Sequence, residues 1–154
     1  MITWKQALRE GAVSGSFASL LSAAYLAWAG ERRGMPAAPV NAVSHWLFGR
    51  RAIDADDPSL QYTLTGYLVH HAASVFWGVM HAKAWGMRPE SSKPLPAIAS
   101  AVATAGVAAF VDLKLTPPRL SPGFEHRLKK PEMTNVYACF ALGLVIGTLL
   151  MRRR

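Results

Sequence analysis

The charged residues of this chain leave four long stretches without any charge, and these stretches constrain the fold more than any other feature. Aspartate, glutamate, lysine and arginine are absent from four windows, which cover residues 11–30, 58–82, 94–111 and 133–151. Each window holds about 20 residues, the length of helix that crosses a hydrocarbon core of about 30 Å. Helices of a soluble bundle, the alternative, normally carry charge on their outer face. The pattern therefore predicts four transmembrane helices.

We predict an all-α fold, an integral membrane four-helix bundle that forms a single transmembrane domain over residues 1–154. The four spans are expected at about 11–29, 60–84, 95–112 and 134–151. A cleaved signal peptide is the alternative for the first window, because Ala27-Trp28-Ala29 resembles a cleavage site. The apolar run is long for a signal peptide, so we expect a permanent span.

Small residues recur at every fourth position in the first and last windows. The residues expected to pack helices together are Gly11, Gly15, Ser19, Gly143 and Gly147. Small side chains of this spacing let two helix backbones approach closely inside a membrane. They predict one packing seam on the first helix and another on the last.

The segment between the first two windows contains a short helix at about 39–48, with Pro39 at its start and Gly49 beyond its end. Its apolar and polar residues separate at helical spacing: Val40, Val43 and Leu47 on one side, and Asn41, Ser44 and His45 on the other. A helix of this length cannot cross a bilayer, so we interpret it as interfacial or re-entrant.

The chain is basic, with a formal net charge of +8, and its cations stand in pairs beside the expected helix ends. These groups are Arg32–Arg33, Arg50–Arg51, Lys129–Lys130 and Arg152–Arg153–Arg154. Nucleic-acid binding would favour one continuous basic face, so we expect no nucleic acid partner. The partners we expect are the bilayer and its anionic headgroups. Basic residues, Arg88 among them, divide almost equally between the two sides, and we place both termini in the cytoplasm.

Polar side chains recur on one face of the second window. At 100° per residue a narrow arc contains Thr63, His70, Ser74, Trp77 and His81. His71 points about 100° away from His70. Such side chains are costly in the membrane and therefore face protein. A neutral imidazole there can bind haem iron or a transition metal, relay protons, or simply bond Ser16, Ser19 or Ser22 of the first helix.

Any cofactor would require several of these groups together. The candidate cofactor ligands are His70, His81 and His45, and the candidate metal ligands are His70, His71 and Asp112. His70 and His81 lie about 16 Å apart along one helix, so a single ion cannot join them. We expect no cofactor, and haem or a transition metal is the alternative. Enzyme motifs such as HExxH, GxSxG and a glycine-rich phosphate loop do not occur in the sequence, so catalysis is not favoured.

The order of landmarks resembles a known family. A proline-rich Pro36-Ala-Ala-Pro39-Val-Asn stretch precedes the short helix, and Leu115-Thr-Pro-Pro118 follows the third span. In this order the chain resembles the YagU-like group of small bacterial inner-membrane proteins, a domain of unknown function. The resemblance implies a multi-pass protein of the bacterial cytoplasmic membrane and supplies no catalytic residues.

Two functions remain open at this point. The first is a non-enzymatic membrane protein that acts through assembly, as a homo-oligomer or as a small subunit of a larger membrane complex, because the seams provide packing surfaces. The second is a haem-, metal- or proton-handling protein that uses the histidines of the second span.

Overall fold

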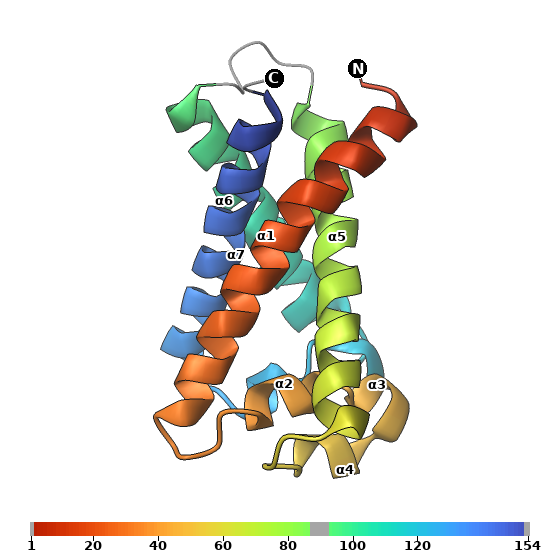
Figure 1. Cartoon of the computed structure of the whole chain (residues 1–154), viewed down its shortest axis with the longest axis vertical. Helices are drawn as coiled ribbons and strands as arrows, with labels where there is room; N and C mark the ends of the chain where they lie inside the picture. The colour runs from red at the N-terminus through yellow and green to blue at the C-terminus, as the bar shows by residue number, and fades with distance from the viewer. Residues whose placement is uncertain (1, 87–92, 153–154) are drawn as a thin grey trace. The chain divides into compact units, whose positions relative to one another are not determined.

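The computed structural model describes residues 2–86 and 93–152, and all of its regular elements there are helical (Figure 1). The prediction of an all-α fold is therefore confirmed. The long helices are α1 (Trp4–Glu31), α5 (Thr65–Trp85), α6 (Pro94–Phe110) and α7 (Lys130–Arg152). A π-helical segment precedes α5 (η1, Leu60–Leu64) and another extends α6 (η3, Val111–Leu115). Arg88, Arg153 and Arg154, which entered the charge analysis, lie outside the described residues.

Three helices in the described part of the chain are long and apolar enough to cross a membrane. They cover Trp4–Glu31, Pro94–Leu115 and Lys130–Met151. The helix α5 is not among them, although residues 58–82 carry no charge. Three histidines, His70, His71 and His81, lower its mean hydropathy. These three helices indicate a membrane protein, and they fall one short of the four predicted spans.

The described helices extend beyond the predicted spans. The helix α1 begins at Trp4 and not near residue 11, and α7 begins at Lys130 and not near residue 134. Charged side chains are tolerated once a helix reaches the headgroup region, and the backbone stays helical beyond that point. Charge-free windows therefore mark the apolar part of a helix and underestimate its length.

The short helix predicted at 39–48 is divided in the structure. Its residues form α2 (Ala38–Val43) and α3 (His45–Phe48), and α4 (Arg50–Ile53) follows after Gly49. Ser44 ends the first piece by donating from its hydroxyl to the Asn41 carbonyl at 2.7 Å. All six residues of α2 are buried, so both its polar and its apolar sides contact protein.

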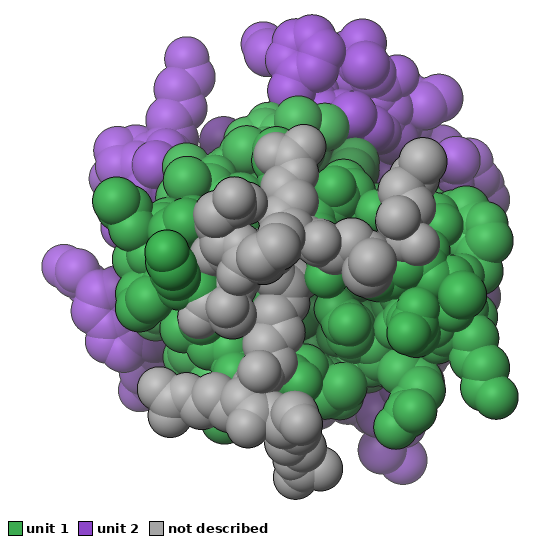
Figure 2. All heavy atoms as spheres, turned by 90° about the horizontal axis from the view of Figure 1, so that it is seen from above, with its two compact units in different colours: residues 1–22, 71–108, 137–154 green, residues 23–70, 109–136 purple. Residues whose placement is uncertain are grey.

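The chain divides into two compact units, coloured separately in Figure 2. Unit 1 contains residues 1–22, 71–108 and 137–154, and unit 2 contains residues 23–70 and 109–136. Unit 1 is built from parts of the four long helices. Its buried apolar core includes Ala18, Ala101, Phe140 and Leu144, with Trp77 packed against them.

Unit 2 is built around α2 and the two loops that cover it. Loop residues 54–59 lead into η1, and the segment after η3 contains two single 3-10 turns, η4 (Pro118–Leu120) and η5 (Phe124–His126). Gly123 has a φ of 94°, and a side chain there would collide with the Ala42 carbonyl oxygen. A glycine is therefore required for this loop to lie against α2.

Candidate functional site

Glycines permit the close approach of α1 and α5 in unit 1. A Cβ atom added at Gly11 would collide with the backbone of Val79, and one at Gly15 would lie 2.6 Å from the Cα atom of Val75. From the other helix, a Cβ atom at Gly78 would lie 2.8 Å from the Cα atom of Gly15. The first predicted seam therefore lies between two helices of the same chain.

The seam of α7 packs against another face of α1. A Cβ atom at Gly143 would collide with the backbone of Ala18, and one at Gly147 with the Cα atom of Ser14. Both seams are thus covered by helices of unit 1. They contribute to the fold, and helices of the same chain already occupy them.

His81 of α5 joins three helices. It is 2% exposed, and its Nδ1 atom lies 2.9 Å from the Thr104 hydroxyl of α6 while its Nε2 atom lies 3.4 Å from the Thr148 hydroxyl of α7. Because Thr104 donates its proton to the Ser100 carbonyl at 2.9 Å, it accepts the proton of Nδ1. This places a proton on Nδ1, while Nε2 faces the Thr148 hydroxyl.

The bond between helix α1 and the histidines of α5 comes from His71. The Nδ1 atom of His71 lies 3.1 Å from the Ser19 hydroxyl, within unit 1. The neighbouring His70 belongs to unit 2, where its ring packs edge-on against Phe124 with 6.5 Å between ring centroids. Helical spacing placed His71 away from the polar arc of α5. The structure shows that α1 packs on the side of α5 that carries His71.

The proposed metal and haem ligands do not form an open coordination site. Among the described residues there is no group of three or more His, Cys, Asp or Glu side chains arranged to hold a metal ion. Both ring nitrogens of His81 face threonine hydroxyls, so this side chain does not fit an axial haem ligand. Asp112 lies partly buried in η3, within the apolar helix Pro94–Leu115.

His45 is a buried part of the loop structure in unit 2. Its Nδ1 atom lies 2.9 Å from the Ala42 carbonyl oxygen and its Nε2 atom 3.2 Å from the Pro118 carbonyl oxygen. Beside it, the Trp46 indole donates to the Ser121 carbonyl at 2.8 Å. These contacts tie α3 to the segment around η4, and each ring nitrogen of His45 faces a carbonyl oxygen.

Asn41 organises the other loop of unit 2. This residue is fully buried, and its Nδ2 atom donates to the carbonyl oxygens of Ala55 and Asp57 at 3.0 and 2.9 Å. Its Oδ1 atom accepts from the Thr63 hydroxyl at 2.6 Å, and that hydroxyl accepts from the Ser59 backbone at 2.9 Å. One side chain thus satisfies the turn that leads into η1.

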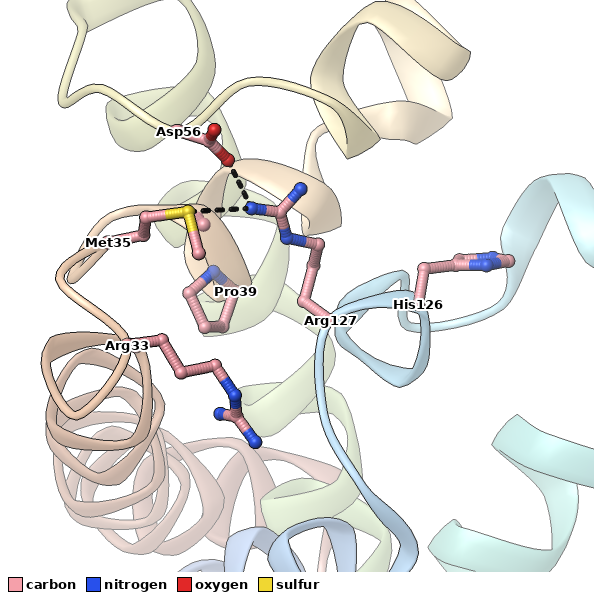
Figure 3. Close-up of a pocket in the computed structure, with 8 residues that line it drawn as sticks. Arg33, Met35, Pro39, Asp56, His126 and Arg127 are labelled. Carbon is pink, nitrogen blue, oxygen red and sulfur yellow. Dashed lines mark hydrogen bonds and ion pairs between the residues drawn. The ribbon is translucent and has the colours of Figure 1, made fainter.

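A pocket of about 400 Å³ opens in unit 2, and it was not expected from the sequence (Figure 3). It is lined by Gly30, Arg33, Met35, Ala38, Pro39, Asp56, His126 and Arg127. Figure 3 shows the Arg127 guanidinium beside Asp56 and Met35, and the His126 ring directed away from them. Arg33 belongs to a basic pair that the sequence marked, whereas Asp56 and Arg127 lie in loops without any periodic pattern.

The fold and this site define a helical membrane protein with a charged pocket in its loop-rich unit. Comparisons with protein-family models, with curated proteins and with solved structures find no match to this chain.

Proposed function

We propose that this chain is a non-enzymatic, multi-pass protein of the bacterial cytoplasmic membrane that acts by assembling with further copies of itself or within a larger membrane complex. The observation that carries this proposal is the use of the deep histidines. His71 bonds α1, His81 bonds α6 and α7, and His45 bonds loop carbonyls, all of which are structural contacts. Interhelical bonds of this kind contribute about 0.6–2 kcal/mol each and are ordinary in helix bundles.

We further propose that α5, together with η1, is a fourth span. Five of its large apolar side chains are exposed, namely Leu60, Leu64, Leu68, Phe76 and Met80, and the exposed Gln61 stands at its beginning, in η1. The histidines that lower its mean hydropathy are bonded to or packed against protein groups and so do not need to meet lipid. The resemblance to the YagU-like proteins and a cytoplasmic position of both termini belong to the same proposal.

The number of spans can be tested by its parity. An even number places the two termini on the same side of the membrane, and three spans place them on opposite sides. We expect a fluorescent protein that folds only in the cytoplasm to be bright when it is fused to either terminus, and a periplasmic phosphatase to be inactive at both. One bright and one dark terminus would exclude the fourth span.

Assembly can be tested with a glycine that the fold does not need. A Cβ atom at Gly106 of α6 meets no atom within 4 Å, and the neighbouring Val102 and Val107 are exposed. Because small residues permit close contact between membrane helices, we expect the purified protein in mild detergent to have the mass of an oligomer or complex. Gly106→Leu should reduce that mass without lowering the unfolding temperature.

The matched control for this experiment is Ala138→Leu, which enlarges an exposed small residue of α7. A strictly monomeric wild-type protein that purifies alone would contradict assembly. An absorption spectrum and metal analysis of the same sample test the alternative, because bound haem or stoichiometric metal would point to cofactor chemistry.

A further inference from the structure

Two arginines and one aspartate line the pocket in unit 2, and a second carboxylate, that of Glu132, pairs with Arg33 from outside the lining. Among its lining residues, Arg33 and Arg127 carry positive charge and Asp56 carries negative charge. His126 also lines the pocket and is exposed, and its Nε2 atom lies 3.7 Å from the Glu125 carboxylate. Arginine guanidinium groups bind phosphate through paired N–H donors, so an open pocket lined by two of them is suited to a phosphate group.

Both guanidinium groups are held in position by the fold. Arg33 donates from Nη1 to the Ala29 carbonyl at 3.0 Å and from Nη2 to the two carboxylate oxygens of Glu132 at 2.8 and 2.7 Å. Arg127 donates from Nη1 to the Ile53 carbonyl at 3.1 Å and from Nη2 to Asp56. Binding of an anion would therefore require little ordering of these side chains, which favours affinity.

The ion pair between Asp56 and Arg127 can be broken by a competing anion. The side chain of Asp56 is 49% exposed, whereas that of Arg127 is 19% exposed. An ion pair with one exposed partner contributes little to stability, so a stronger ligand can replace it. Asp56 then acts as an internal competitor that an incoming anion displaces.

We propose that this pocket binds a phosphate-bearing anion between Arg33 and Arg127, in competition with Asp56. The phosphodiester of an anionic lipid headgroup and free phosphate share this chemistry. A lipid source agrees with the aromatic side chains at the same end of α1, since Trp28 is 51% exposed and Arg32 lies over its ring at 5.2 Å. The proposal is independent of assembly and of the number of spans.

The decisive variants are Asp56→Asn and its control Asp54→Asn. Both remove one negative charge from the same loop, but Asp54 pairs with the exposed Arg50 and does not line the pocket. The full-length protein in a zwitterionic detergent is titrated with inorganic phosphate, with chloride at equal ionic strength as reference, and unfolding temperature is followed. Parallel titrations use phosphatidylglycerol and phosphatidylcholine in mixed micelles.

We expect Asp56→Asn to tighten binding about fivefold relative to Asp54→Asn, and Arg33→Gln or Arg127→Gln to weaken it about fivefold. A gain of affinity cannot result from misfolding, so it separates ligand binding from a structural role. Binding of phosphatidylglycerol without phosphate identifies the lipid as the source, and binding of phosphate alone identifies the free anion. The proposal is overturned if neither probe binds, or if Asp56→Asn gains no more affinity than Asp54→Asn.

Discussion

Leucine at Gly143 or at Gly147 is expected to prevent the protein from folding stably. At both positions even a Cβ atom would collide with the backbone of α1, at Ala18 and Ser14. Overpacking of a core usually costs about 1–3 kcal/mol, and collision with backbone, which cannot rotate away as a side chain can, should exceed that range. Unfolding in detergent, followed by tryptophan fluorescence, should show a lost or strongly lowered transition.

The control for these two variants is Ala138→Leu, which adds comparable volume on the exposed side of the same helix. It should retain the wild-type unfolding temperature within a few degrees. Leu144, between the two glycines, is fully buried in the core of unit 1, so a substitution there would itself change stability and would not serve as a control. Equal stability of the glycine variants and the control would show that α7 does not cross α1 at these residues.

Aspartate at position 41 is expected to cause the largest loss of stability in unit 2. The substitution Asn41→Asp replaces the amide that donates to the Ala55 and Asp57 carbonyls with a carboxylate that faces them. A fully buried charge opposite two acceptors should cost at least about 3 kcal/mol. Thermal unfolding at neutral pH measures the loss.

Acid should partly restore this variant, because a protonated carboxyl group can donate to one of the two carbonyls. The control is Asn135→Asp, the same chemical change at an exposed residue of α7 that donates to the Tyr25 hydroxyl at 2.9 Å. That control should be nearly neutral at every pH. A stable Asn41→Asp variant at neutral pH would mean that the loop before η1 does not depend on this side chain.

The sequence predicted the helices well because long apolar helices leave a one-dimensional signal. The positions of α1, α6 and α7 follow directly from the gaps between charges, and the stripe of Gly11, Gly15, Gly143 and Gly147 coincides with close helix crossings. The helix that packs against each seam could not be predicted from this spacing. Spacing along a helix identifies a packing face, but not whether the neighbour belongs to the same chain.

Unit 2 was much harder to predict, for physical reasons that Asn41 and Arg127 illustrate. Asn41 bonds backbone carbonyls in a loop that has no periodicity, and Arg127 bonds the Ile53 carbonyl, 74 residues away in the sequence. Any residue type supplies a carbonyl, so such contacts leave no pattern of residue types. The charged pocket depends on these contacts to backbone carbonyls, and it could therefore not be predicted from the sequence.

Unit 1 also imposes an order on biosynthesis, because it combines the first described helix with the last. Ser14 and Ala18 on α1 meet their partners on α7, Gly147 and Gly143, only after roughly 130 further residues have been made. At about 5–20 residues per second, the ribosome needs about 6–26 s for this stretch. During that interval lipid or an insertase must cover the face of α1 that carries Ser14 and Ala18. Nascent chains arrested before α7 should therefore stay bound to the insertion machinery or be degraded by membrane proteases.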